Sequence, residues 1–330
     1  MTTSISLSSP AALVAALPYL LGFEPRDSVI LAWLEHRRLL LAQRVDLPDN
    51  PGDAGWAAAL VAPQAVDRAE AAVVALATDR PDVEELAAAV RQALEAAGVP
   101  VLDIVQTWDD RWRSLMCSVE ACCPSTGRAV DPVTRDAVAA EFAWAGVAPL
   151  PDRQALECAL VRDDVRAAAV RWRLPLDVAD LETWRDAAIP STVALLTGEE
   201  GRVGLDSAAE AIGALADVRV RDTVLWEAMA WPNERLHRAL TMAETLVRSA
   251  PRGWLAPVAT VYSALAWLAG DGARAGIALE RVRDEDPDYS LANLIRTAIT
   301  AGMPPESWRF ALAALTREDC RYGADTPSLT

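Results

Sequence analysis

Three cysteines within seven residues carry the clearest chemical potential in this chain. They are Cys117, Cys122 and Cys123, in the sequence CSVEACCPSTG. Thiolates bind soft metal ions, and they also form and exchange disulfides. A structural zinc ion takes four Cys or His ligands, usually from C-x2-C pairs, whereas this segment supplies three with C-x4-C-C spacing. The other candidates for a fourth ligand are all distant in the sequence: Cys158, Cys320, His36 and His237.

Three interpretations of this segment are open: a metal site, a redox or disulfide centre, and ordinary packing beneath the turn PSTG. Most buried cysteines are inert and pack as small apolar residues. We therefore favour packing within a sheet domain, and we expect neither a bound metal ion nor a cofactor. Asp109, Asp110 and Glu120 offer oxygen ligands nearby. Mixed oxygen and thiolate ligation suits no common structural metal, and these acids are typical of a turn between strands.

Other catalytic chemistry has little support. Nucleophilic catalysis needs a base, and both histidines lie in segments typical of the surface, His36 in a turn and His237 on a charged helix. All 31 basic residues are Arg, which excludes Schiff-base and P-loop chemistry because both need Lys. No glycine-rich phosphate loop follows a predicted strand, so the sequence does not support nucleotide binding. A non-enzymatic role is favoured.

A second polar segment is GFEPRDS, residues 22–28, which joins a predicted helix to a predicted strand. Arg26, Asp27 and Ser28 could bind an anion or a polar ligand at the edge of a sheet. Turn chemistry explains the same residues, and we favour the turn.

The elements that must position these residues alternate between helix and strand up to about residue 130. Apolar residues at helical spacing predict a helix over 10–21, with Ser9 before it and Gly22 after it. Residues 28–47 predict a β-hairpin. The following elements are a helix at 54–68, a strand at 71–78, a helix at 81–98, and strands at 99–108 and 111–116. A strand, a helix and a strand in succession indicate a parallel crossover beside an antiparallel hairpin, so residues 1–130 predict a mixed α/β sheet domain that ends in the Cys-rich turn.

Residues 131–330 predict a helical domain, which makes the fold class α+β. Within this domain, residues 268–287 are similar to the second half of a tetratricopeptide repeat, with Gly270, Ala275, Leu279 and Pro287 in matching places. We therefore predict an antiparallel helix pair at 256–289. Three units normally form a free-standing solenoid, so this would be a small array.

This resemblance also suggests where a partner would bind. It places Thr260, Ala264, Trp267 and Leu268 on a groove face of the first helix, where another protein would dock. The alternative is that Trp267 is a core residue, because large aromatic side chains are usually well buried. Both interpretations are open.

Charge and composition limit the partners and the compartment. The chain has 47 acidic and 31 basic residues, a formal charge of −16, so phosphate backbones repel it and nucleic acid is a disfavoured partner. No long apolar, uncharged run predicts a membrane span. The first basic residue is Arg26 and Pro18 interrupts the apolar N-terminal stretch, which is unlike a secretory signal. An odd number of cysteines, five, then suggests a reducing cytoplasm without disulfides.

Several segments resemble an actinobacterial family, domain of unknown function 4192. They are SPAALVAALPYLLGFEPRDSVILAWL, RWRSLMCSVEACCPSTGRAVD, VRVRDTVLW and AWLAGDGARAGIALERVRDEDPDYSLANLIRTAITAGMPP. The resemblance implies an actinobacterial, cytoplasmic protein and no particular activity. We expect a non-enzymatic protein-interaction or adaptor module. The alternative is a metal-binding or redox-active protein, or an enzyme, that uses Cys117, Cys122 and Cys123.

Overall fold

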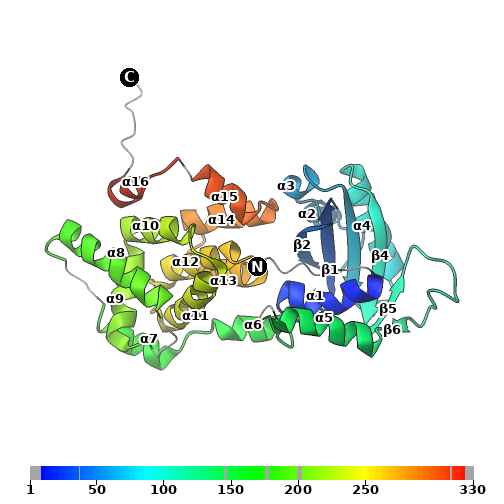
Figure 1. Ribbon diagram of the computed structural model, residues 1–330, viewed down its shortest axis with the longest axis horizontal. Coiled ribbons are helices and arrows are strands. Elements are labelled where there is room, and N and C mark those ends of the chain that lie inside the picture. The colour runs from blue at the N-terminus through cyan, green and yellow to red at the C-terminus, as the bar shows by residue number, and fades with distance from the viewer. Residues whose placement is uncertain are drawn as a thin grey trace, which may run out of the picture. The chain divides into compact units, whose positions relative to one another are not determined.

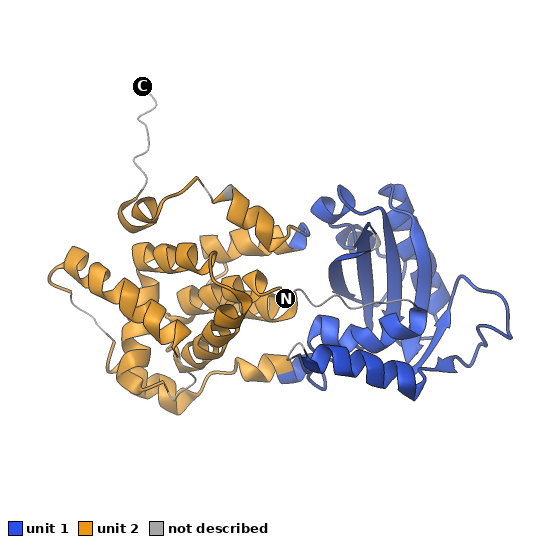
Figure 2. Ribbon diagram, viewed as in Figure 1, with its two compact units in different colours: residues 1–155, 300–302 blue, residues 156–299, 303–330 orange. Residues whose placement is uncertain are grey.

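The protein consists of two compact units. The computed structural model describes residues 9–36, 38–144, 147–174, 178–198, 203–312 and 314–323. Unit 1 comprises residues 1–155 and 300–302, and unit 2 comprises residues 156–299 and 303–330 (Figure 2). Unit 1 is a sheet covered by helices and unit 2 is helical (Figure 1), so the predicted α+β class is confirmed.

Unit 1 contains a six-stranded mixed sheet with strand order β2-β1-β3-β4-β5-β6. The strands are β1 (Ser28–Glu35), β2 (Arg38–Asp46), β3 (Ala71–Ala77), β4 (Val101–Trp108), β5 (Arg111–Ser114) and β6 (Arg128–Ala129). The predicted hairpin is β1 and β2, paired antiparallel with Ser28 opposite Asp46. The predicted crossover is β3 and β4, paired parallel with Val74 opposite Ile104. The remaining neighbours pair antiparallel.

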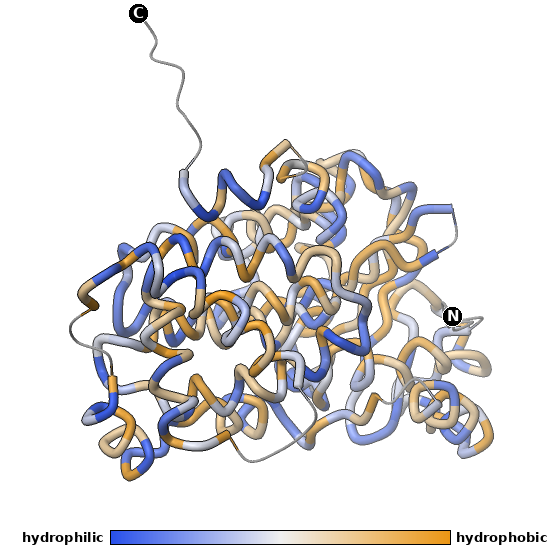
Figure 3. The backbone as a smooth tube through the Cα atoms, turned by 60° about the vertical axis from the view of Figure 1, so that its left-hand side comes forward, coloured by the Kyte–Doolittle hydropathy of each residue, from blue (hydrophilic) through white to orange (hydrophobic). Residues whose placement is uncertain are grey.

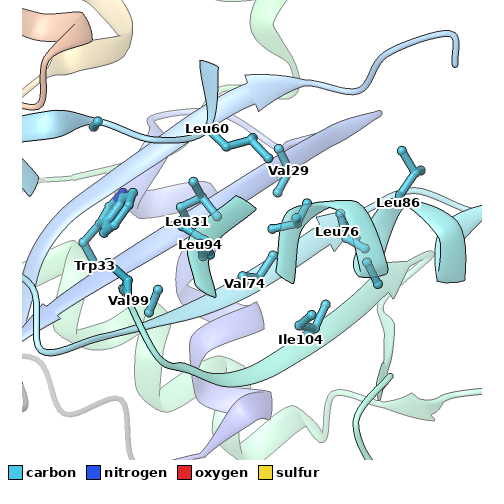
Figure 4. Close-up of a cluster of buried hydrophobic side chains, with 14 of the residues drawn as sticks. Val29, Leu31, Trp33, Leu60, Val74, Leu76, Leu86, Leu94, Val99 and Ile104 are labelled. Carbon is cyan, nitrogen blue, oxygen red and sulfur yellow. The ribbon is translucent and has the colours of Figure 1, made fainter. Parts of the chain in front are cut away.

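Helices cover both faces of this sheet. The helices of unit 1 are α1 (Pro10–Leu21), α2 (Ala54–Ala59), α3 (Pro63–Val66), α4 (Val83–Ala96) and α5 (Pro132–Trp144). Alternate residues of β1, β3 and β4 form one core with α2, α3 and α4, as Figure 4 shows for Leu31, Val74, Leu76, Leu86 and Ile104. The intervening residues face the other way, where Val105 contacts Val14 of α1. Strand β1 is therefore apolar at consecutive positions because both of its faces are buried.

Local sequence signals explain most element ends. The Ser9 hydroxyl accepts a hydrogen bond from the Ala12 N–H at the start of α1, and Gly22, with φ of 78°, ends that helix. The helix predicted over 54–68 is instead two short helices, because Pro63 begins a new helix and cannot continue the first one. The two-residue strand β6 was not predicted from the sequence.

The units divide at residue 155, beyond the boundary predicted at residue 130. The reason is that α5 packs on α1 within unit 1. The rings of Tyr19 and Phe142 stack with centroids 4.7 Å apart, and Ala12, Ala16 and Val138 are buried around them. The helical region therefore contributes its first helix to the sheet unit.

Unit 2 is built from helices, and hydrophilic and hydrophobic residues alternate along the backbone of the chain (Figure 3). The boundary between the two units falls within α6 (Arg153–Ala159). The helices that follow it are α7 (Asp164–Arg171), α8 (Leu181–Thr197), α9 (Leu205–Ala216), α10 (Val218–Ala228), α11 (Asn233–Ser249), α12 (Leu255–Leu268), α13 (Gly272–Glu285), α14 (Ser290–Thr300), α15 (Pro305–Ala311) and α16 (Arg317–Tyr322). Buried Arg321 bonds Glu182 and Asp186 and so ties α16 to α8. No described helix has the length and apolar character needed to cross a bilayer.

Helix α12 is the centre of unit 2. All 14 of its residues are buried, and it packs against α9, α10, α11 and α13. The predicted helix pair is present as α12 and α13, and the Ser263 hydroxyl donates to the Ala275 carbonyl across it. The expected groove face is not exposed, since Thr260, Ala264, Trp267 and Leu268 are between 0 and 6% exposed. Trp267 stacks on Trp308 of α15 with ring centroids 5.1 Å apart, so these side chains are core residues.

Burial of Trp267 leads to a stability prediction. Trp267→Ala should lower the free energy of unfolding by about 3–5 kcal/mol, because it removes a large buried side chain and leaves a cavity. Urea denaturation followed by far-UV circular dichroism measures the change. Trp172→Ala is the matched control, since Trp172 is 88% exposed, and it should change stability by less than about 0.5 kcal/mol. Equal effects of the two substitutions would contradict the core assignment.

Candidate thiol site

The three clustered cysteines lie in the loop between β5 and β6, which extends from the edge of the sheet (Figure 1). This loop is fixed where it returns to the sheet. Gly127 has φ of 69°, and a Cβ atom there would lie 2.6 Å from Cη2 of Trp108. The Arg111 guanidinium donates to the carbonyls of Thr126 and Gly127. Glycine is therefore required at this position by its backbone angle and by the indole ring against it.

A local turn brings the three sulfur atoms together. The Val119 carbonyl accepts hydrogen bonds from the N–H groups of both Cys122 and Cys123, at 2.9 and 2.8 Å. The chain thus folds back over the four residues that separate Cys117 from Cys122. The three Sγ atoms lie within 4.8 Å of one another, and those of Cys122 and Cys123 are 3.9 Å apart.

The site is at the surface of unit 1. Cys117 and Cys123 are half-buried and Cys122 is exposed. The packing interpretation expects the cysteines to fill the space beneath the turn PSTG. Half-burial of Cys117 and Cys123 agrees with such packing, whereas Cys122 is exposed. Packing alone does not require the three sulfur atoms to converge. All five cysteines are free thiols.

The thiols differ in acidity. The Val119 N–H donates to Cys117, and with further hydrogen bonds from Cys123 and Cys122 it lowers the pKa of Cys117. Burial raises the pKa of Cys123. As pH rises, Cys117 therefore loses its proton before Cys123.

A groove of about 740 Å³ adjoins the cluster through Cys117. One wall is a single stripe of α4, at positions 84, 87, 88, 91, 92, 95 and 96, and the other is the segment from Leu115 to Ser118, with Ile104 between them. Arg91 bonds Glu95 across one turn of α4, and Arg113 pairs with Glu84 at 3.6 Å. Both charge signs are thus present at a groove with an alanine-rich wall.

The structure places the second polar segment in a turn, as the sequence favours. Asp27 has φ of 42° and its carboxylate accepts a hydrogen bond from the Thr78 hydroxyl at 2.9 Å. Ser28 is buried and donates to the Arg26 carbonyl. The Gln106 amide bonds the Thr78 carbonyl and joins the same network. Asp27 and Ser28 are therefore satisfied within the fold, and Arg26 is exposed beside them.

The remaining sequence candidates do not join the thiol cluster. Asp109 and Asp110 both have positive φ and form the turn between β4 and β5, while Glu120 accepts from the Ser125 N–H. His36 lies in the β1–β2 turn beside Glu70, and exposed His237 bonds the Asn233 carbonyl of its own helix. Among the described residues, the group of possible metal ligands around these sulfurs contains the three cysteines alone.

Sequence reasoning did not identify the groove wall formed by α4. The sequence does predict this helix, and it places Glu84, Ala88, Arg91 and Glu95 in one row at helical spacing. The structure shows that this row is exposed. The sequence does not show that Leu115 to Ser118 lie opposite this row, because that placement depends on the pairing of β4 with β5.

Most of this chain matches the model of one protein family. Residues 10–306 match the family model described as Domain of unknown function (DUF4192). The chain belongs to this family. The DUF4192 match includes the thiol loop, the groove and helices α1 to α14. No curated protein and no solved structure matches the chain.

The contact between Gly127 and Trp108 leads to a second prediction. Gly127→Ala should destabilise unit 1 by about 2–5 kcal/mol, because it adds a clash with the indole to the cost of a left-handed alanine. Gly98→Ala is the matched control, since Gly98 has φ of 80° and open space around it, and it should cost about 1–2 kcal/mol. Urea denaturation of both variants measures the difference. Equal costs would show that Trp108 does not hold the loop.

Proposed function

We propose that unit 1 binds a soft metal ion, Cu(I) or Zn(II), through Cys117, Cys122 and Cys123. The observation that supports this most directly is the convergence of three sulfur atoms within 4.8 Å in one short loop. Soft thiolates select these ions among the common biological metals.

The distances between the three sulfur atoms suit a single ion bound by all of them. Three sulfurs that each lie ~2.3 Å from one ion are about 3.8–4.0 Å apart. Cys122 and Cys123 already have this separation, at 3.9 Å, and Cys117 needs a shift of less than about 1 Å. The bonds of the Val119 carbonyl to both cysteine N–H groups keep the backbone in place during that shift.

The number of protein ligands determines how each ion would be coordinated. With three thiolates from the described residues, Cu(I) would be three-coordinate, whereas Zn(II) would complete its coordination with water or another external ligand. Exposed Cys122 leaves the ion reachable from solvent. Binding deprotonates the thiols, so the affinity should rise with pH.

Metal reconstitution tests this function. We expect the reduced protein to bind one ion per chain and to protect three of its five thiols from titration. Cys117→Ser, Cys122→Ser and Cys123→Ser should each weaken binding by more than about 100-fold, because loss of a ligand exceeds the loss of an outer-shell partner. Competition with a chromophoric chelator measures the affinity for each ion separately.

The control for these variants is Cys158→Ser. Cys158 is exposed and lies outside the cluster, so its replacement should leave stoichiometry and affinity unchanged. Fewer than one ion per ten chains, with all five thiols titrating freely, would overturn the proposal. Equal affinities of the loop variants and the control would do the same.

A protein-interaction role is a second proposal, and it concerns unit 2. The observation in its favour is an exposed apolar stripe along α7 and its C-cap residue Trp172, since Val165 and Trp172 are 83 and 88% exposed. Ala168 lies between them at helical spacing and is also exposed. Such a stripe suits a partner helix or another apolar surface. The likeness of α12 and α13 to a tetratricopeptide helix pair, and an actinobacterial cytoplasm as the location, supplement this proposal on sequence grounds.

Affinity purification with matched tryptophan variants tests the interaction role. A partner that binds the stripe should co-purify with the full chain and be lost with Trp172→Ser, because an exposed aromatic anchor is removed. Trp144→Ser is the control, since Trp144 is also 88% exposed but belongs to unit 1. Quantitative mass spectrometry compares the two, and identical co-purifying proteins would contradict a role for α7.

A further inference from the structure

The groove beside α4 and the thiol cluster share one residue, Cys117. We propose that the metal-free form carries out thiol–disulfide exchange with a small disulfide bound in this groove, with Cys117 as the attacking thiol and Cys123 as the resolving thiol. This activity goes beyond metal binding and does not require it.

The geometry distinguishes Cys117 from its neighbours. Cys117 forms part of the groove wall, whereas Cys122 and Cys123 are absent from the residues that line it. A disulfide in the groove therefore meets the Cys117 sulfur first. Cys122 and Cys123 both have their sulfur within 4.8 Å of the Cys117 sulfur, and Cys123 follows as the resolving residue because it is the half-buried one of the two. Attack by one thiol and resolution by a second is the usual course of exchange.

The groove determines the class of substrate. A volume of about 740 Å³ accommodates a drug-sized molecule. Its wall carries Arg91, Gln92 and Glu95 beside exposed Ala88, so both charge signs and an amide face the ligand. This lining suits a zwitterionic, peptide-like disulfide that has both carboxylate and ammonium groups. Glutathione disulfide is the probe with these properties.

The reaction balances in two steps. The Cys117 thiolate attacks one sulfur of the disulfide RSSR, which forms a Cys117–SR mixed disulfide and releases one thiolate RS⁻. The Cys123 thiolate then attacks the Cys117 sulfur, which forms the Cys117–Cys123 disulfide and releases the second RS⁻. The two protons of the protein thiols pass through solvent to the two released thiolates. The protein is oxidised by two electrons and RSSR is reduced to two RSH.

Mass spectrometry of the metal-free protein with glutathione disulfide tests the sequence of steps. We expect the wild-type chain to lose two hydrogens through a Cys117–Cys123 disulfide, located by peptide mapping. Cys123→Ser combined with Cys122→Ser should stop at the mixed disulfide on Cys117, because both possible resolving thiols are gone. Cys117→Ser should slow the reaction by at least about tenfold, since the thiol at the groove is removed.

A groove-filling variant tests the substrate site. Ala88→Trp should slow the reaction with glutathione disulfide by at least about tenfold, because the indole occupies the space of the ligand. It should leave the reaction with 2,2′-dithiodipyridine unchanged, since that compact disulfide does not need the groove. Ala137→Trp is the control, because it is the same substitution at an exposed position of α5. This variant should react as the wild type does with both disulfides. Thermal melts confirm that each variant is folded.

Two results would overturn the proposal. The first is initial mixed-disulfide formation on Cys122 in the wild-type chain, which would show that exposure alone directs the reaction. The second is an equal rate of Ala88→Trp and Ala137→Trp with glutathione disulfide, which would show that the groove does not hold the substrate. Both results are independent of whether the reduced protein binds a metal ion, so failure here and failure of metal binding are separate outcomes.

Discussion

Burial of β1 and β3 on both faces is the constraint on which unit 1 depends. Consecutive residues of these strands point to opposite faces, and both sets are apolar, from Val29 and Ile30 to Val74 and Ala75. Helices must therefore cover the two faces, and they leave little room for polar chemistry in the middle of the sheet. The strands farther out are less buried, and β5 is intermediate or exposed throughout. Reactive side chains consequently occur where the chain leaves this edge, in the loop that carries the cysteines.

Local signals were sufficient to predict most of the fold of unit 1. Helix α4 has acidic residues in its first turn and Gly98 after its end, and the hairpin of β1 and β2 has apolar runs on both sides of a turn. The prediction errors arise where tertiary contacts determine the structure. Helix α5 has an ordinary helical pattern, but only the contact of Phe142 with Tyr19 shows that it belongs to the sheet unit. Strand β6 pairs through two residues, which is too short for a periodic signal.

The candidate site was partly visible in the sequence. The spacing of Cys117, Cys122 and Cys123 indicates a possible cluster, but C-x4-C-C does not specify how the chain turns, so the sequence alone favours packing and leaves metal binding and redox chemistry as alternatives. The contact of Gly127 with Trp108 joins residues whose identities give no sign of their proximity. For Trp267 the periodicity is equally ambiguous. A stripe of apolar residues on α12 suits a groove as well as a core. The helices packed around α12 bury it, which makes these residues part of the core.

Metal binding needs all three sulfurs of the loop close together, and thiol exchange needs two of them, Cys117 and Cys123. The Val119 carbonyl and the Trp108–Gly127 contact restrain the loop backbone independently of the side-chain chemistry. An ion would bind all three thiolates and leave Cys117 unable to attack a disulfide, whereas a Cys117–Cys123 disulfide would remove two of the three ligands. The two states therefore exclude each other on one scaffold. The balance between them follows from the supply of soft metal ions and of small disulfides, because each consumes the thiolates that the other needs.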